Sequence, residues 1–146
     1  MRGINFPTSM YSGVLAKFIP RMLAGERPAI YGDGEQSRDF TFIQNVVEAN
    51  WLACHAPAAQ VAGMAFNAAT GSRVTLNEVY RILQRLTGYS GAPEYVSERL
   101  GDILHSLADI SLASKHFGYK PSVTLQQGLE HTVQWYRQAL AATAST

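Results

Sequence analysis

Apolar residues recur at three- and four-residue spacings in five stretches of the chain, which is the spacing of one face of an α-helix. This pattern predicts helices over residues 12–25, 45–56, 75–87, 110–117 and 124–140. Shorter apolar runs between turn residues predict strands at 29–31, 64–69 and 92–96. The run at 64–69 is almost continuously apolar, which is typical of a strand that is covered on both faces.

Capping residues mark where these helices begin. Ser12 precedes the first helix, Asp109 precedes the fourth, and Asn45/Glu48, Thr75/Glu78 and Thr124/Gln127 have the spacing of a capping box.

Glycines mark where the helices end, at Gly25, Gly88 and Gly118. Pro20 lies inside the first helix, where it removes one hydrogen bond, so we expect a kink there or two short pieces. The helix at 45–56 is apolar on nearly all sides and is predicted to be buried, with Cys54 packed inside. Residues 58–63 are predicted to form a loop of small residues.

The order of elements predicts an α/β fold in which helices surround a short, few-stranded sheet. With 146 residues, the chain is expected to form a single domain over 1–146, in which 1–11 are a loose leader and 141–146 a frayed tail. A three-stranded sheet is too small to cover all these apolar faces. Some face is therefore expected to meet another domain.

Composition narrows the class of protein. Hydrophobic residues are 47% and charged residues 16%, which is typical of a globular chain. The net charge is +1 and basic residues form no run, so we expect no nucleic-acid partner. No apolar run reaches the length of a membrane span, and no signal peptide is recognisable. The single Cys54 excludes an internal disulfide framework and suits a reducing compartment, so a cytoplasmic location is expected.

The stretch 31–40, with the sequence YGDGEQSRDF, carries the first candidate chemistry. It is close to the dinucleotide fingerprint G-x-G-x-x-G, but Ser37 replaces the third glycine and no helix follows, so that reading is rejected. Arg38 could meet an anion with a planar fork of donors, or it could be a solvated residue of a surface hairpin.

A second candidate follows the last predicted strand. Arg99 and Asp102 lie in one loop, where Arg99 could help bracket a diphosphate and Asp102 could accept from a ribose hydroxyl. The alternative is a solvated cluster of Glu98, Arg99 and Asp102. The chain has no P-loop, no histidine or cysteine spacing of a metal site, no G-x-S-x-G and no Tyr-x-x-x-Lys.

Several segments, in the same order, resemble the C-terminal, substrate-binding part of extended short-chain dehydrogenase/reductases. The nearest type is the nucleotide-sugar 4-epimerase that acts on UDP-glucose or UDP-N-acetylglucosamine. The segments are 11–14 (YSGV), 30–34 (IYGDG), 38–40 (RDF), 46–49 (VVEA), 66–71 (FNAATG), 98–102 (ERLGD), 106–111 (SLADIS) and the final helix from Leu129 to Tyr136.

The resemblance implies a role for eight residues. Arg38 and Arg99 would grip the diphosphate of a UDP-sugar, and Asp102 would bind its ribose. Ser106 would lie beside the sugar, where a small residue leaves room for an N-acetyl group. The uracil pocket would be lined by Ala29 and Tyr31, with Val14 and Leu15 nearby.

Departures from the family pattern affect the expected activity. The dinucleotide-binding domain, with its glycine motif and Tyr-x-x-x-Lys pair, precedes this part in the family, whereas this chain starts at Met1 past that point. Asn45 stands at a common Asp position and Leu100 at a common Pro position. Without a nicotinamide ring and a base, the chain alone is expected not to catalyse epimerisation.

Three functions therefore remain open. In the first, the chain is a substrate domain that binds a UDP-sugar weakly, or only with a dinucleotide-binding partner chain, and NAD is expected only together with such a separate domain. In the second, it is a non-enzymatic interaction or dimerisation module, for which a homodimer is the simplest arrangement. The third and least favoured is a complete small enzyme of new chemistry.

Overall fold

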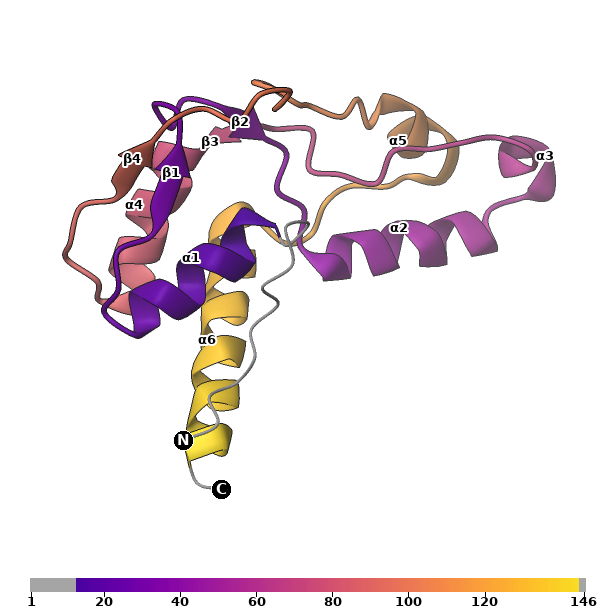
Figure 1. Cartoon of the computed structure of the whole chain (residues 1–146). Coiled ribbons are helices and arrows are strands. Elements are labelled where there is room, and N and C mark those ends of the chain that lie inside the picture. Colours follow the sequence, from indigo (N-terminus) through magenta and orange to yellow (C-terminus); the bar gives the residue numbers. More distant parts are fainter. Residues whose placement is uncertain (1–12, 145–146) are drawn as a thin grey trace. The chain divides into compact units, whose positions relative to one another are not determined.

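The computed structural model describes residues 13–144, so the predicted leader and the Ser12 cap lie outside the described residues (Figure 1). The described chain mixes helices with short strands, as predicted for the fold class. It divides into two compact units. Of the described residues, unit 1 comprises 13–35, 76–102 and 129–144, and unit 2 comprises 36–75 and 103–128. A single domain over the whole chain stays a prediction.

The elements follow one another in the order α1 (Val14–Leu23), β1 (Ala29–Tyr31), β2 (Ser37–Arg38), α2 (Ile43–His55), α3 (Ala58–Val61), β3 (Val74–Thr75), α4 (Leu76–Thr87), β4 (Glu94–Val96), α5 (Ser111–Phe117) and α6 (Leu125–Ala144). The expected three-stranded sheet is replaced by two separate pairs of strands among the described residues. The β1 and β4 strands pair in parallel within unit 1, and β2 and β3 pair antiparallel within unit 2.

The first helix of unit 1 runs without a break through Pro20, so the prediction of two short pieces is wrong. Phe18, Ile19 and Met22 are buried on either side of the proline, and their packing outweighs the one missing hydrogen bond. The end of α1 confirms the predicted glycine stop. Gly25 has φ +74°, and the amides of Gly25 and Glu26 donate to the carbonyls of Met22 and Arg21.

The core of unit 1 is formed by helices α1, α4 and the part of α6 that begins at Leu129. Ile19, Val79 and Leu83 are fully buried, and the rings of Phe18 and Tyr80 meet edge to face with their centroids 6.2 Å apart. Arg137 of α6 donates to the carbonyl of Leu86 at 2.7 Å, which ties α6 to the end of α4. The helix at 76–87 and its stop before Gly88 are therefore confirmed.

In unit 2, α2 begins two residues earlier than the predicted cap. Phe42 is the capping residue and makes no side-chain cap bond, so the Asn45 cap is wrong. Asn45 instead lies inside the helix and is fully buried. Its side chain accepts from the amides of Ser122 and Val123 and donates to the carbonyl of Val123 at 2.8 Å. A long-range contact has replaced the local one.

The expectation that α2 is buried is wrong for this chain. Only Asn45 and Ala49 are buried on α2, whereas Ile43, Val47 and Trp51 are 65%, 60% and 65% exposed. These three residues follow the spacing i, i+4, i+8 and so form one face of the helix. Cys54, expected inside, is also exposed.

Two further predictions for unit 2 are wrong. Residues 64–69 form no strand, because the described part of the chain offers no strand that pairs with them. The predicted loop at 58–63 contains the short helix α3.

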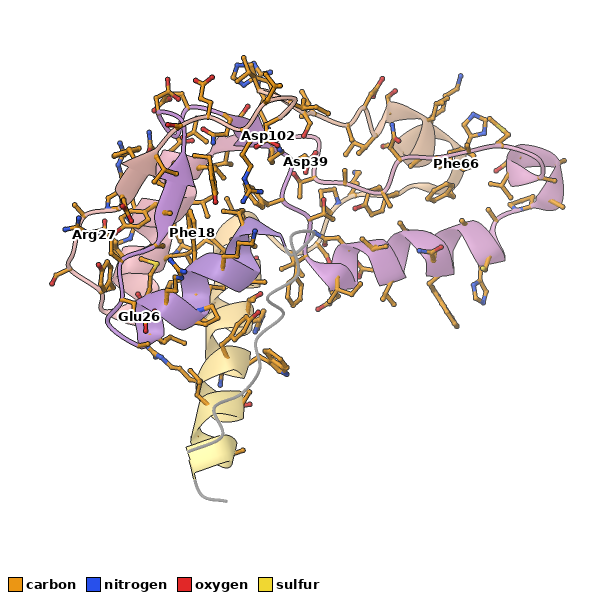
Figure 2. The ribbon with its side chains drawn as sticks, in the orientation of Figure 1. Phe18, Glu26, Arg27, Asp39, Phe66 and Asp102 are labelled. Carbon is orange, nitrogen blue, oxygen red and sulfur yellow. The ribbon has the colours of Figure 1, made fainter. Side chains whose placement is uncertain are left out.

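The small core of unit 2 is a cluster of Ala49, Ala113 and Tyr119, and Ala69 and Val123 of this unit are also buried. Phe66 packs on its border, with its ring centroid 5.0 Å from that of Phe117 (Figure 2). The Tyr119 hydroxyl donates to the carbonyl of Ala69 at 2.8 Å, which anchors the non-helical 64–69 segment.

The last two helices match their predicted starts closely. The α5 helix begins at Ser111, whose amide donates to the carboxylate of Asp109 at 2.8 Å. The capping box of α6 is confirmed, since the Thr124 amide donates to Oε1 of Gln127 and the Gln127 amide to Oγ1 of Thr124. The α6 helix continues to Ala144, four residues into the stretch that was predicted to fray, and the frayed tail stays a prediction. Residues 145–146 lie outside the described residues.

Candidate functional site

In unit 1, the candidate site is built around Tyr31, the last residue of β1. The guanidinium carbon of Arg99 lies 3.8 Å from the centroid of the Tyr31 ring, which is cation–π stacking. Hydrogen bonding and charge from Arg99 lower the pKa of Tyr31 below its usual value, and the charges of Lys17 and Arg21 act in the same direction. Three cations therefore act on one half-buried aromatic residue.

A β-turn holds Arg99 and Asp102 at its two ends. The amide of Asp102 donates to the carbonyl of Arg99 at 3.2 Å, and Gly101 between them has φ +87°. A turn with positive φ at its third residue favours glycine there and proline at the second position, which Leu100 fills here. The side chain of Asp102, labelled in Figure 2, is exposed.

A cleft of about 470 Å³ lies between α1 and β1, within the range of small-molecule sites. Ala29 and Tyr31 line it, as do Lys17 and Arg21. Glu26, in the turn that joins α1 to β1, adds one carboxylate to the lining (Figure 2). Sequence reasoning missed the two basic residues, although their i, i+4 spacing on the predicted helix was a usable signal.

Val14 and Leu15, predicted near the uracil pocket, lie in the first turn of α1 and are half-buried. They are not among the residues that line the cleft. Their proximity to a ligand stays a prediction.

In unit 2, Arg38 lies at the end of β2 and its side chain is held by backbone carbonyls. Its Nη1 donates to the carbonyl of Ser37 at 2.8 Å and to that of Leu104 at 3.0 Å. The guanidinium therefore has a fixed position, unlike that of a solvated surface arginine. Its other N–H groups are the donors that an anion could use.

The neighbouring Asp39, which is labelled in Figure 2, binds other groups than Arg38 does. Its carboxylate accepts from the amide of Thr70 at 3.0 Å, from the Thr70 hydroxyl at 2.5 Å and from the amide of Gly71 at 2.9 Å. Asp39 thus fixes the turn at 70–71. The Arg-Asp pair of the sequence therefore contains one candidate ligand residue and one structural residue.

Ser106 also belongs to unit 2. Its amide donates to the carbonyl of Ser37 at 3.0 Å, which places it beside the strand that carries Arg38. The structure thus brings Arg38 and Ser106 together in unit 2, and Ala29, Tyr31, Arg99 and Asp102 together in unit 1. Sequence reasoning missed His105, whose Nδ1 lies 2.9 Å from the Ser37 hydroxyl.

Over residues 13–144, no three side chains of His, Cys, Asp or Glu are grouped so that they could hold a metal ion. In the same part of the chain, no helix combines the length and apolar character that crossing a bilayer requires.

Known proteins match both the sequence and the fold. Residues 2–69 match the NAD dependent epimerase/dehydratase family. UDP-glucose 4-epimerase of Mycolicibacterium smegmatis is 34% identical over 126 residues, which are 86% of this chain and 39% of that protein. A crystal structure of UDP-glucose 4-epimerase from Thermotoga maritima with UDP-glucose has a TM-score of 0.82 at 39% identity, covering 88% of this chain and 40% of that one.

A second solved structure agrees. UDP-N-acetylglucosamine 4-epimerase from Methanobrevibacter ruminantium, in complex with UDP-N-acetylmuramic acid, has a TM-score of 0.80 at 36% identity. That match covers 90% of this chain and 41% of the epimerase.

These matches confirm the resemblance found in the sequence. The chain is homologous to the NAD dependent epimerase/dehydratase family. Within that family, it is similar to a part of the UDP-sugar 4-epimerases, and it spans about two fifths of the length of the curated relatives it matches.

Proposed function

We propose that this chain is a substrate-binding part of a nucleotide-sugar epimerase and binds a UDP-sugar. Arg38 and Arg99 contact the diphosphate, and Asp102 accepts from the ribose. The uracil lies against Ala29 and Tyr31, with Val14 and Leu15 nearby, and Ser106 lies beside the sugar. The observation that carries the proposal is the stacked Arg99–Tyr31 pair at a cleft with two further cations, in a chain similar to proteins solved with UDP-sugars.

Charge supports an anionic ligand. No ion pair among the described residues neutralises Lys17 or Arg21 in the cleft, although Glu26 also lines it. Arg38 and Arg99 are each held locally, one by two carbonyls and one by an aromatic ring, so little side-chain entropy is lost when a phosphate binds. A guanidinium suits the paired oxygens of a diphosphate.

We further propose that the chain by itself does not epimerise its ligand. The reaction needs a hydride acceptor and a base, and the sequence lacks both the glycine fingerprint and the Tyr-x-x-x-Lys pair. NAD would act only together with a separate dinucleotide-binding domain. Turnover of UDP-glucose to UDP-galactose by the purified chain with added NAD, followed by NMR, would contradict this.

Titration calorimetry with UDP and UDP-glucose tests the binding itself. A charged hydrogen bond is worth about 1.5–3 kcal/mol, so Arg38→Ala and Arg99→Ala should each weaken binding roughly 10- to 100-fold. Exposed cations away from the site are the matched controls, with Arg85→Ala for unit 1 and Lys115→Ala for unit 2, and both should leave the affinity unchanged. Equal affinity in wild type, Arg38→Ala and Arg99→Ala refutes the proposed grip.

A second candidate function is an interaction or dimerisation module. It is favoured by the exposed apolar face of α2, formed by Ile43, Val47 and Trp51, because faces of this kind often mark protein partners. A second copy or a dinucleotide-binding chain would cover it. Light scattering that finds a dimer, together with no calorimetric heat at millimolar UDP, would favour this candidate over the first.

A further inference from the structure

The segment 104–106 extends the β2–β3 pair of unit 2 on its other side. Ser37 pairs with Thr75 of β3 on one side, and on the other it forms a parallel bridge with His105. The Ser37 amide donates to the carbonyl of Leu104 at 2.8 Å, and the Ser37 carbonyl accepts from the amide of Ser106 at 3.0 Å. Ser37 is therefore the central residue of three adjacent backbone segments and is buried.

Little apolar packing holds this added segment in place. Ile103, Leu104 and Leu107 are 65%, 62% and 55% exposed, so their side chains contribute little to its attachment. Polar side-chain contacts remain: the Ser37 hydroxyl and Nδ1 of His105 are 2.9 Å apart, and Nη1 of Arg38 donates to the carbonyl of Leu104. A buried hydroxyl requires a partner, and His105 provides it from an exposed position.

The same segment also holds the candidate ligand residues of unit 2. The carbonyl of Leu104 accepts from Nη1 of Arg38 at 3.0 Å, and Ser106 is fixed to Ser37 through its amide. Displacement of 104–106 from β2 would therefore release one of the two carbonyls that orient Arg38 and would move Ser106 as well.

We propose that His105 is a positioning residue, whose bond to Ser37 holds 104–106 on β2 and thereby orients Arg38 and Ser106. The role in orienting these residues toward a ligand rests on the proposed function. The attachment itself does not, because it concerns the free protein. His105 binds no part of the ligand in this arrangement and acts through Arg38.

Amide hydrogen exchange measured by NMR on the free chain tests the attachment. Loss of a hydrogen bond of about 1.5 kcal/mol should speed exchange of the Ser37 and Ser106 amides by roughly tenfold in His105→Phe, which keeps a ring but no nitrogen. His105→Asn can still reach Ser37 and should restore most of the protection. His55→Phe, an exposed histidine on α2, is the matched control. Unchanged exchange at Ser37 and Ser106 in His105→Phe overturns the proposal.

A double-mutant cycle identifies the two partners. Ser37→Ala removes the same bond from the other side, so it should speed exchange of the Ser106 amide by a similar factor, and the double variant should add nothing further. If the effects of the two substitutions on exchange of the Ser106 amide were additive, His105 would act through a group other than Ser37. That result would overturn the proposed His105–Ser37 bond. Since His105 is exposed, its variants keep the test available even if Ser37→Ala does not fold.

Calorimetry with UDP then tests the link to Arg38. His105→Phe should weaken binding roughly fivefold and His105→Asn should restore it, whereas in an Arg38→Ala background His105→Phe should have no additional effect. A full additional loss in that background would show direct contact with the ligand and overturn the positioning role. If wild type binds no UDP, the proposed function fails, and the exchange experiment still decides the attachment.

Discussion

The two units bury their apolar side chains to very different degrees. Unit 1 contains fully buried Ile19, Val79 and Leu83 on helices that pack on one another. Unit 2 has a core cluster of two alanines and one tyrosine, and one whole face of its longest complete helix is exposed. A stripe of apolar residues predicts a helix and a buried face in both units. Only tertiary structure shows whether the covering element belongs to the same unit.

The largest expected effect comes from the core of unit 1. Leu83→Ala should lower the free energy of unfolding by about 2–5 kcal/mol, because the side chain is fully buried between helices. Trp135 lies on the unit 1 part of α6, so urea unfolding followed by fluorescence in a Trp51→Phe background reports this unit. A loss below 1 kcal/mol would mean that the core of unit 1 is much looser than described.

In unit 2, the residue whose substitution lowers the free energy of unfolding most should be a polar one. Asn45→Ala leaves the amides of Ser122 and Val123 without their partner, at a cost of about 2–4 kcal/mol. Urea unfolding in a Trp135→Phe background, with Trp51 as the reporter of unit 2, measures it. Asn50→Ala on the same helix is the control, since Asn50 is exposed and contacts only the carbonyl of Val46, and it should change stability by less than about 0.5 kcal/mol.

A small effect is expected at the exposed face of α2. Trp51→Ser should change the free energy of unfolding by no more than about 0.5 kcal/mol in dilute solution, because the side chain is 65% exposed. Chemical denaturation at several protein concentrations measures this. A loss above 1 kcal/mol that grows with concentration would show that the face is covered by another copy, and the contrast between the units would then be weaker than the structure indicates.

The smallest effect concerns the titration of Tyr31. Arg99 lowers the pKa of Tyr31 below 10.0, so Arg99→Gln should return the pKa of Tyr31 toward 10.0. A lowered pKa favours the phenolate in the folded state. The contribution of Tyr31 to stability is therefore largest above pH 10.0 and is lost as the pH falls through its folded pKa. Ring-resolved NMR titration would follow it, and an unchanged Tyr31 midpoint in Arg99→Gln would contradict the stacking.

The pKa of Tyr80 is shifted in the opposite direction from that of Tyr31. Burial raises the pKa of Tyr80 to about 12, which favours its neutral form in the folded state. Its contribution to stability is therefore complete below pH 10 and is lost as the pH rises from 10 toward 12. Tyr80→Phe should remove this alkaline loss, since its hydroxyl donates only to the carbonyl of Gly91.

Local chemistry was predictable from the sequence, and long-range pairing was not. The stops at Gly25 and Gly88 and the Thr124/Gln127 box depend on residues within one turn, and all three are present in the structure. Asn45 has the same local pattern, but a segment 77 residues away takes its side chain. Residues 64–69 could form a strand only if a second strand paired with them, and their own sequence does not determine whether such a partner exists.

The candidate site shows the same division. The sequence indicated Arg38, Arg99 and Asp102 as candidate ligand residues, and the resemblance gave them roles on a UDP-sugar. The structure shows the carbonyls, the ring and the turn that hold them. Lys17 and Arg21 had a helical spacing that could have been noticed. His105 could not have been assigned a role from spacing, because its partner Ser37 lies 68 residues away in the chain.

Each unit is assembled from separated stretches of chain, and this sets an order for synthesis on the ribosome. Unit 2 ends at residue 128, whereas unit 1 also needs residues from 129 onward, including buried Leu129 and Val133. The unit that is started first is therefore the last to be completed. While the chain emerges, α1 and α4 remain without their third helix, so newly made unit 1 exposes apolar surface until the part of α6 from Leu129 to Tyr136 has been made.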